Sequence, residues 1–155
     1  TPSMAGLLTA SSMGIYNAAK AAVVSLTETL YHDLNLVTDQ IGASLLCPYF
    51  VPTGITSSER NRNNAPQTSE LTKSQLIGQA MSNKAVSSGK ITAGEIAHRV
   101  FDAISANQFY VFSHPKALGN VQSRMENIVS VTNQADPFLA RPEIGIAREA
   151  QLKAA

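Results

Sequence analysis

Residues 14–47 carry the pattern that decides the fold: GIYNAAKAAVVSLTETLYHDLNLVTDQIGASLLC. Over residues 14–37, apolar side chains recur at spacings of three and four, which is the periodicity of an amphipathic α-helix. The stripe consists of Ile15, Ala18, Ala19, Ala22, Val23, Leu26, Leu30 and Leu34. The apolar run at residues 42–47 is bounded by Gly42 and Pro48 and fits a buried strand. This stretch therefore predicts a long helix followed by a strand.

The rest of the chain continues the alternation of helices and strands. Thr92 with Glu95 three residues later is a capping-box pattern, which predicts the start of a helix over residues 93–106. Residues 109–113, FYVFS, have the aromatic and β-branched composition of a strand. We also expect a strand end and loop over 1–13, loops over 56–69 and 85–91, helices over 70–84 and 116–133, and a surface-bound or frayed tail over 136–155. This order indicates an α/β fold with a parallel sheet and crossover connections.

The composition indicates a packed domain and argues against several kinds of partner. The chain has 155 residues, 44% of them hydrophobic and 15% charged, so a core is expected and extensive disorder is not. A net charge of +1 with scattered Lys and Arg argues against binding to nucleic acid or an anionic membrane. The single cysteine, Cys47, makes no internal disulfide, and no Cys/His spacing predicts a metal site. No stretch has the length of a membrane span or the form of a signal peptide, so we expect a soluble, cytoplasmic protein.

Two features predict that the sequence is part of a longer domain. Three strands are few for a parallel sheet, whose two faces must both be covered. The chain begins at Thr1, and a start at Met4, the first methionine, would remove Ser3. We therefore expect residues 1–155 to be one partial domain that lacks N-terminal sequence.

Tyr16 and Lys20 are the first candidates for chemistry. They are four residues apart on the predicted helix, so their side chains lie on one face. A free tyrosine has a pKa of about 10, and a nearby cation favours the phenolate and lowers that pKa. A tyrosine tuned in this way can exchange a proton with the oxygen of a carbonyl or an alcohol. The same spacing also arises by chance on a solvated helix face, so the pair alone leaves both interpretations open.

Ser3 favours the catalytic interpretation. It precedes Tyr16 by 13 residues and stands at the expected end of the strand before the helix. With this serine, the sequence S-M-A-G-L…G-I-Y-N-A-A-K-A-A-V resembles the short-chain dehydrogenase/reductase family, which places a serine at the end of a central strand and a Tyr-x-x-x-Lys in the next helix. Gly6 and the small residues around Lys20 match the family as well. The resemblance implies the C-terminal half of a doubly wound, Rossmann-type parallel sheet.

The turn after the predicted strand at 42–47 extends the resemblance. Where the family has Pro-Gly-x-Val-x-Thr, this chain has Pro48-Tyr49-Phe50-Val51-Pro52-Thr53, with Tyr49 in place of the glycine. The resemblance implies that the backbone around Val51 holds a nicotinamide carboxamide and that the Thr53 hydroxyl bonds to the carboxamide or the phosphates. Pro48, Val51 and Thr53 would then share the cofactor site with Tyr16 and Lys20. The alternative for this segment is a proline-rich turn without a ligand.

By resemblance, the parent enzyme transfers hydride between NAD or NADP and a small carbonyl or secondary-alcohol substrate. Tyr16 would be the general acid or base, Lys20 would lower the pKa of Tyr16 and bind the nicotinamide ribose, and Ser3 would polarise the substrate oxygen. Residues 56–90 match the family's variable substrate loop, expected to act as a lid, and the family commonly forms homodimers or homotetramers. The family's glycine-rich dinucleotide turn, its Asn-Asn-Ala-Gly stretch and its further catalytic asparagine are not in this sequence.

A different class of function stays open. The chain also fits a non-catalytic fragment that acts as an interaction or oligomerisation module through the helix at 14–37 and the strand at 109–113. The sequence before Thr1 separates the two, because a glycine-rich turn there indicates an enzyme and a start codon indicates a module. The residues present specify neither the substrate nor the choice between NAD and NADP.

Overall fold

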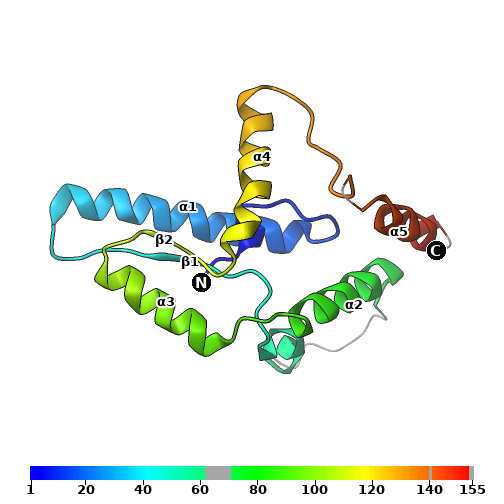
Figure 1. Ribbon diagram of the computed structural model, residues 1–155, viewed down its shortest axis with the longest axis horizontal. Coiled ribbons are helices and arrows are strands. Elements are labelled where there is room, and N and C mark those ends of the chain that lie inside the picture. Colours follow the sequence, from blue (N-terminus) through cyan, green and yellow to red (C-terminus); the bar gives the residue numbers. More distant parts are fainter. Residues whose placement is uncertain (62–70, 140, 154–155) are drawn as a thin grey trace.

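The structure is a computed structural model that describes residues 1–61, 71–139 and 141–153. Groups of helices precede, separate and follow the two strands of the described chain (Figure 1). In chain order they are η1 (Met4–Gly6), α1 (Gly14–Val37), β1 (Leu45–Cys47), η2 (Gly54–Asn61), α2 (Lys73–Ser87), α3 (Ala93–Ser105), β2 (Tyr110–Phe112), η3 (Pro115–Ala117), α4 (Leu118–Val129) and α5 (Pro142–Lys153), where η marks a 3-10 helix.

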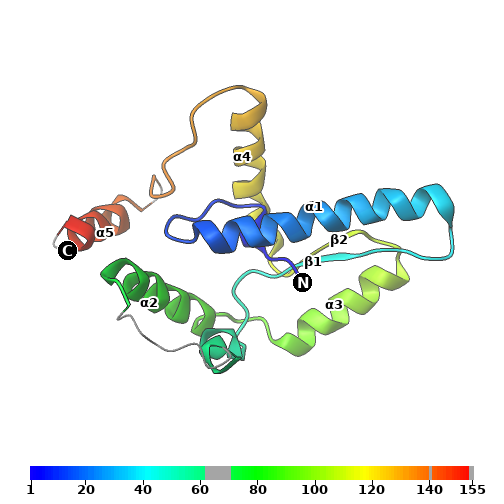
Figure 2. The same ribbon diagram turned by 180° about the vertical axis from the view of Figure 1, so that it is seen from behind.

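Within the described residues, β1 and β2 form a two-stranded parallel sheet. Their connection runs through η2, α2 and α3, which is the kind of crossover that parallel strands require. α1 lies along one side of the strands and α3 along the other (Figures 1 and 2). The paired residues are Leu45 with Tyr110, Leu46 with Val111 and Cys47 with Phe112. The expected α/β class with a parallel sheet is therefore confirmed.

The core joins the N-terminal segment to α1 and β1. Its buried members are Met4 from η1, Val24 from α1, and Leu45 and Cys47 from β1. The N–H of Met4 donates to the carbonyl oxygen of Pro48 at 2.9 Å. Burying a side chain of this kind contributes roughly 1.5–3 kcal/mol. The core thus holds the N-terminal segment against α1 and against the end of β1.

α1 has the bounds that the sequence predicts, but its apolar stripe is not the side that packs on the strands. Ile15 is 91% exposed and Leu26 is 70% exposed, whereas Val24, outside the stripe, is buried. The face of α1 that carries Val24 packs on Met4, Leu45 and Cys47, and the stripe lies on other sides of the helix. Most of the stripe therefore faces outward.

The strand that was expected to end within residues 1–13 does not form in the described chain. The backbone at Ser3 is extended, with φ −161° and ψ 161°, and residues 4–6 form the 3-10 turn η1 instead. A strand needs a neighbour that pairs with its peptide groups, and β1 pairs with β2. The expectation of three strands is therefore corrected to two.

The segment between β1 and α3 is more helical than expected. The loop predicted at 56–69 begins within η2, and its residues 62–69 lie outside the described ranges. The helix predicted at 70–84 is observed as α2, which starts at Lys73 after the N-cap Thr72 and continues to Ser87. Thr72 and Gln75 form a capping box at its first turn. The loop predicted at 85–91 is correspondingly shorter. The capping box before α3 is confirmed, since Thr92 N–H donates to the Glu95 carboxylate at 2.7 Å.

The C-terminal part of the chain also differs from the expectation. The helix predicted at 116–133 is divided into η3 and α4 and ends at Val129. The tail from residue 136, expected to be surface-bound or frayed, contains a further helix, α5, which contacts Ser11 through Arg148. Within the described ranges, no helix combines the length and apolar character needed to cross a membrane.

Candidate functional site

Tyr16 and Lys20 lie in the first two turns of α1. Their i, i+4 spacing places both side chains on one face of the helix, and the Lys20 ammonium lies 5.5 Å from the centroid of the Tyr16 ring. Both residues are partly buried. The structure therefore brings the predicted phenol and ammonium groups together.

A second contact ties Lys20 to the N-terminal segment. Its Nζ donates to the carbonyl oxygen of Thr1 at 3.0 Å. An ammonium group carries three N–H donors, so this bond uses one of them. Lys20 thus connects the helix that carries Tyr16 to the segment that carries Ser3.

Ser3 is held at the junction of η1 and the turn after β1. It is the N-cap of η1, and its Oγ accepts from the Ala5 N–H at 3.2 Å. The same hydroxyl donates to the carbonyl oxygen of Pro48 at 3.3 Å. Ser3 is partly buried. Ser3 and Pro48, both predicted as site residues, are therefore in direct contact although 45 residues separate them.

Gly6 determines how closely η1 approaches α1. A Cβ atom at this position would lie 2.7 Å from the carbonyl oxygen of Lys20 and 2.9 Å from Cγ2 of Val24. These distances are shorter than any ordinary contact, so only glycine fits. The close approach explains how the Ser3 segment reaches the helix that carries Tyr16 and Lys20.

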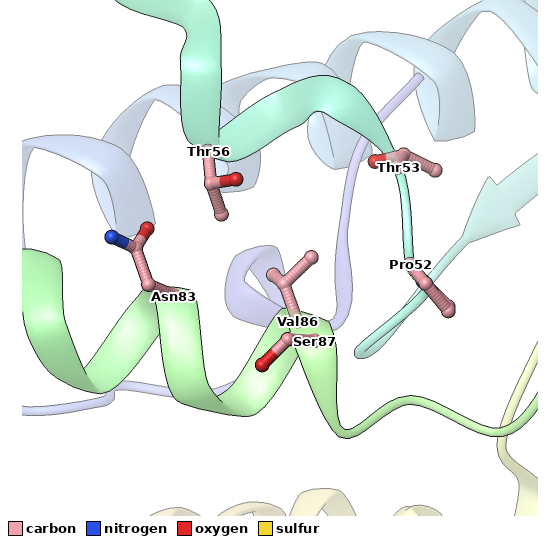
Figure 3. A pocket seen from close by; sticks show the side chains of 6 residues that line it. All are labelled: Pro52, Thr53, Thr56, Asn83, Val86 and Ser87. Carbon is pink, nitrogen blue, oxygen red and sulfur yellow. The ribbon is translucent and has the colours of Figure 1, made fainter.

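The predicted cofactor-binding turn after β1 leads into a pocket. Val51 is buried, and Thr53 is exposed with its Oγ1 accepting from the Ile55 N–H at 3.4 Å. Thr53 lines a pocket of about 400 Å³ in which the turn and η2 face α2 (Figure 3). Its lining residues are Pro52, Thr53, Thr56, Asn83, Val86 and Ser87. Among the described residues, no hydrogen bond joins Thr53 to Tyr16 or Ser3.

Gly89, which no sequence motif indicates, lets this turn approach the end of α2 closely. A Cβ atom there would lie 2.5 Å from the carbonyl oxygen of Phe50 and 2.8 Å from Cδ of Pro52. Tyr49, which replaces the family's glycine, turns its ring onto Phe50 with the centroids 4.1 Å apart. Gly89 and Phe50 are far apart in the sequence, so no local pattern signals this contact.

The other titratable groups near the carboxyl ends of the strands favour their neutral forms. Burial raises the pKa of Tyr49. Burial, followed by the negative charge of Glu28, raises the pKa of Cys47 to about 11. Burial, followed by the positive charge of Arg99, lowers the pKa of His114. In the described part of the chain, no three His, Cys, Asp or Glu side chains are grouped so that they could hold a metal ion.

Two side chains that the sequence analysis did not select hold the loop before Tyr16. Asn17 donates from Nδ2 to the carbonyl oxygen of Ala10 at 2.8 Å. Arg148 of α5 donates from Nη1 to Oγ of Ser11 at 3.0 Å. The first contact spans seven residues and the second spans 137, so the second leaves no trace in local sequence patterns.

Comparison of the sequence with known proteins agrees with the arrangement of these residues. A family model described as short chain dehydrogenase matches residues 1–64, the part that contains Ser3, Tyr16, Lys20 and the turn after β1. The chain is 32% identical over 134 residues to a CLA biosynthesis dehydrogenase/reductase of Lactiplantibacillus plantarum. That match covers 83% of this chain and 46% of the relative.

The chain is also similar to solved structures of short-chain dehydrogenases. A short chain dehydrogenase/reductase from Burkholderia phymatum, solved in complex with NAD, superposes with a TM-score of 0.85 at 50% sequence identity, over 88% of this chain and 49% of that one. A putative short-chain dehydrogenase from Novosphingobium aromaticivorans shares the fold, with a TM-score of 0.55 at 24% identity, over 99% of this chain and 44% of that one. The chain thus spans about half the length of these relatives. Its sequence and its parallel α/β structure show that it belongs to the short-chain dehydrogenase/reductase family.

Proposed function

We propose that the protein that contains this chain is an NAD(P)-dependent oxidoreductase that interconverts a small carbonyl compound and a secondary alcohol by hydride transfer. The observation that carries the proposal is the position of the Tyr16–Lys20 pair against the segment that carries Ser3. Lys20 lies beside the Tyr16 ring, bonds to Thr1 near Ser3, and is approached closely by Gly6. A phenol and an ammonium on one helix face, with a hydroxyl on the adjoining segment, form a suitable set for exchanging a proton with a polarised oxygen atom.

Tyr16 is the proton donor in the reducing direction and the acceptor in the oxidising direction. The Lys20 ammonium lies 5.5 Å from the centroid of the Tyr16 ring, which places a positive charge beside the reacting phenol. Both observed bonds of Ser3 are made by its Oγ, so on substrate binding Ser3 would turn its single hydroxyl proton from the Pro48 carbonyl oxygen to the substrate oxygen. Each proton-transfer group of this kind contributes about 10²–10⁴-fold in rate.

The side chains present fit the nicotinamide end of a dinucleotide. The Lys20 ammonium gives one of its three donors to Thr1, which leaves donors that suit ribose hydroxyls. The backbone at Val51 and the Thr53 hydroxyl follow the carboxyl end of β1, where ligands of parallel α/β sheets bind. The cofactor, when bound, supplies or accepts the hydride. The Burkholderia phymatum relative, solved in complex with NAD, supports this assignment.

The pocket beside Thr53 is the place for the part of the substrate that does not react. It lies between the turn after β1 and α2, within the region expected to close as a lid (Figure 3). Its lining contains two threonines, an asparagine and a serine as well as Val86 and Pro52. Such a mixture suits a small substrate with both polar and apolar groups.

Replacement of one hydroxyl tests the proposal. In the full-length enzyme, Tyr16→Phe should lower kcat by about 10²–10⁴-fold, because the proton donor is lost. The readout is NAD(P)H absorbance with a panel of ketones and secondary alcohols. Tyr31→Phe is the matched control, since Tyr31 lies on the same helix and packs on Phe109 with the ring centroids 4.7 Å apart.

Binding of the cofactor separates chemistry from folding in this test. NADH fluorescence should titrate alike in Tyr16→Phe, Tyr31→Phe and the unchanged protein, because removal of one hydroxyl leaves most cofactor contacts intact. Full turnover in Tyr16→Phe would overturn the assignment.

The exposed apolar side of α1 supports a second role, self-association into a homodimer or homotetramer. Leu26 and Leu30 of the stripe are 70% and 48% exposed, and Leu36 and Val37 at the end of the helix are 83% and 79% exposed. An apolar surface of this length is typical of a protein interface.

A non-catalytic interaction module is the alternative function. It predicts that the unchanged protein turns over none of the ketones and secondary alcohols of the panel.

A further inference from the structure

Arg148 of α5 makes an unusual contact with the loop that precedes Tyr16. Only 9% of the residue is exposed. Its Nη1 donates to Oγ of Ser11 at 3.0 Å, and its Nη2 donates to the carbonyl oxygen of Ser11 at 3.4 Å and to Oγ of Ser12. One guanidinium group therefore bonds to three oxygen atoms of two consecutive residues.

The local packing shows that this contact is specific. Burying a charge is costly unless its donors are bonded, and here oxygens of Ser11 and Ser12 accept three hydrogen bonds from the guanidinium. The Phe138 ring lies 5.8 Å from the guanidinium carbon and stabilises the cation from another side. Gly145 makes room for that ring, since a Cβ atom there would lie 3.0 Å from Cβ of Phe138.

The loop needs support from outside, because its own backbone is strained. Ser12 has φ 63°, which is the left-handed region that residues other than glycine rarely adopt. Such a conformation costs about 1–3 kcal/mol and persists only where neighbouring contacts impose it. The N-cap of α1, Met13, makes no side-chain capping bond either. The start of α1, two residues before Tyr16, therefore depends on how the loop is held.

We infer that Arg148 is a positioning residue that fixes loop 9–13 and so sets the direction of the Tyr16 hydroxyl relative to Ser3. The loop connects the Ser3 segment to Tyr16, and Asn17 ties its beginning to α1 through the carbonyl oxygen of Ala10. Arg148 ties its end to α5. α5 approaches this loop at the end of the molecule where α1 begins (Figures 1 and 2).

Hydrogen exchange tests the contact without any turnover. In the full-length protein, Arg148→Ala should speed amide exchange of residues 9–13 by about tenfold or more, because bonds to a charged group are lost. Exchange in α3 should not change. Arg141→Ala is the matched control, since Arg141 is an exposed arginine of the same C-terminal segment. Unchanged exchange in residues 9–13 would overturn the inference.

Kinetics test the consequence for Tyr16, which rests on the proposed function. Arg148→Ala should lower kcat by about tenfold and leave NADH binding unchanged, because small misplacements of a catalytic group slow the chemical step. Arg148→Lys, which keeps one charged donor, should recover part of the loss. In the Ser11→Ala/Ser12→Ala background, Arg148→Ala should add little. An unchanged kcat despite faster exchange would overturn the positioning role.

The two measurements separate the inference from the function on which it rests. Full activity of Tyr16→Phe would overturn the proposed function, whereas the exchange result would still report on the contact between Arg148 and the loop. If Tyr16→Phe is inactive and Arg148→Ala behaves as the unchanged protein in both assays, the function stands and the positioning role is wrong.

Discussion

Replacing Gly6 with alanine is a sharp test of how the site is assembled. A Cβ atom at residue 6 would lie 2.7 Å from the carbonyl oxygen and 2.8 Å from the carbonyl carbon of Lys20. Both are backbone atoms of α1, so no rotation of a side chain relieves the clash. η1 and α1 must move apart, and Ser3 must move with η1.

The size of the effect follows from the distances. Ordinary contact begins at 3.4 Å, so the two elements must separate by about 0.7 Å. Overpacking of this kind costs about 1–3 kcal/mol. Alanine also lowers the conformational entropy of the unfolded chain, which offsets about 0.4–1 kcal/mol of this loss in the free energy of unfolding. We expect a net loss of about 1–2 kcal/mol in the free energy of unfolding, and a loss of about tenfold in kcat as Ser3 leaves its position relative to Tyr16.

Urea denaturation of the full-length protein and steady-state kinetics measure the two effects. Gly14→Ala is the control, because a Cβ atom at Gly14 meets nothing within 4 Å. That variant should be at least as stable as the unchanged protein, since alanine favours the helix. If Gly6→Ala unfolds at the same urea concentration as Gly14→Ala and keeps full activity, the close approach of η1 to α1 is not what assembles the site.

Two further predictions follow from named contacts. Thr92→Ala should lower the free energy of unfolding by about 1 kcal/mol, because α3 loses the side-chain cap that accepts from the Glu95 N–H. Urea denaturation measures this effect, and an unchanged midpoint of the urea unfolding curve would contradict it. Cys47, with its pKa raised from 9.0 to about 11, should react with a disulfide reagent at pH 8 at least about 100-fold more slowly in the folded protein than in urea. Its protonated thiol stabilises the fold fully below about pH 9, and this contribution is lost as the pH rises through about 11. Equal reaction rates in the folded and unfolded states would show that Cys47 is not buried as described.

Local sequence patterns predicted the elements that local hydrogen bonds define. α1 begins at Gly14 and ends at Val37 as its periodicity indicates, and α3 starts after the Thr92 cap. These features depend on bonds between residues three or four positions apart, which a sequence pattern records directly. The expected strand before Ser3 failed for the opposite reason, because a strand exists only where a distant neighbour pairs with it.

The candidate site divides in the same way. The sequence by itself determined that Tyr16 and Lys20 share a helix face, since that follows from the pitch of an α-helix. Only the tertiary structure decided that Ser3 contacts Pro48 and that Gly6 lies directly against the backbone of Lys20. The same is true of the contact between Arg148 and the loop before Tyr16. The tertiary structure also decided that the apolar stripe of α1 faces outward. These contacts join residues that are far apart in the sequence and depend on the shape of single side chains, and the periodicity of the chain records neither.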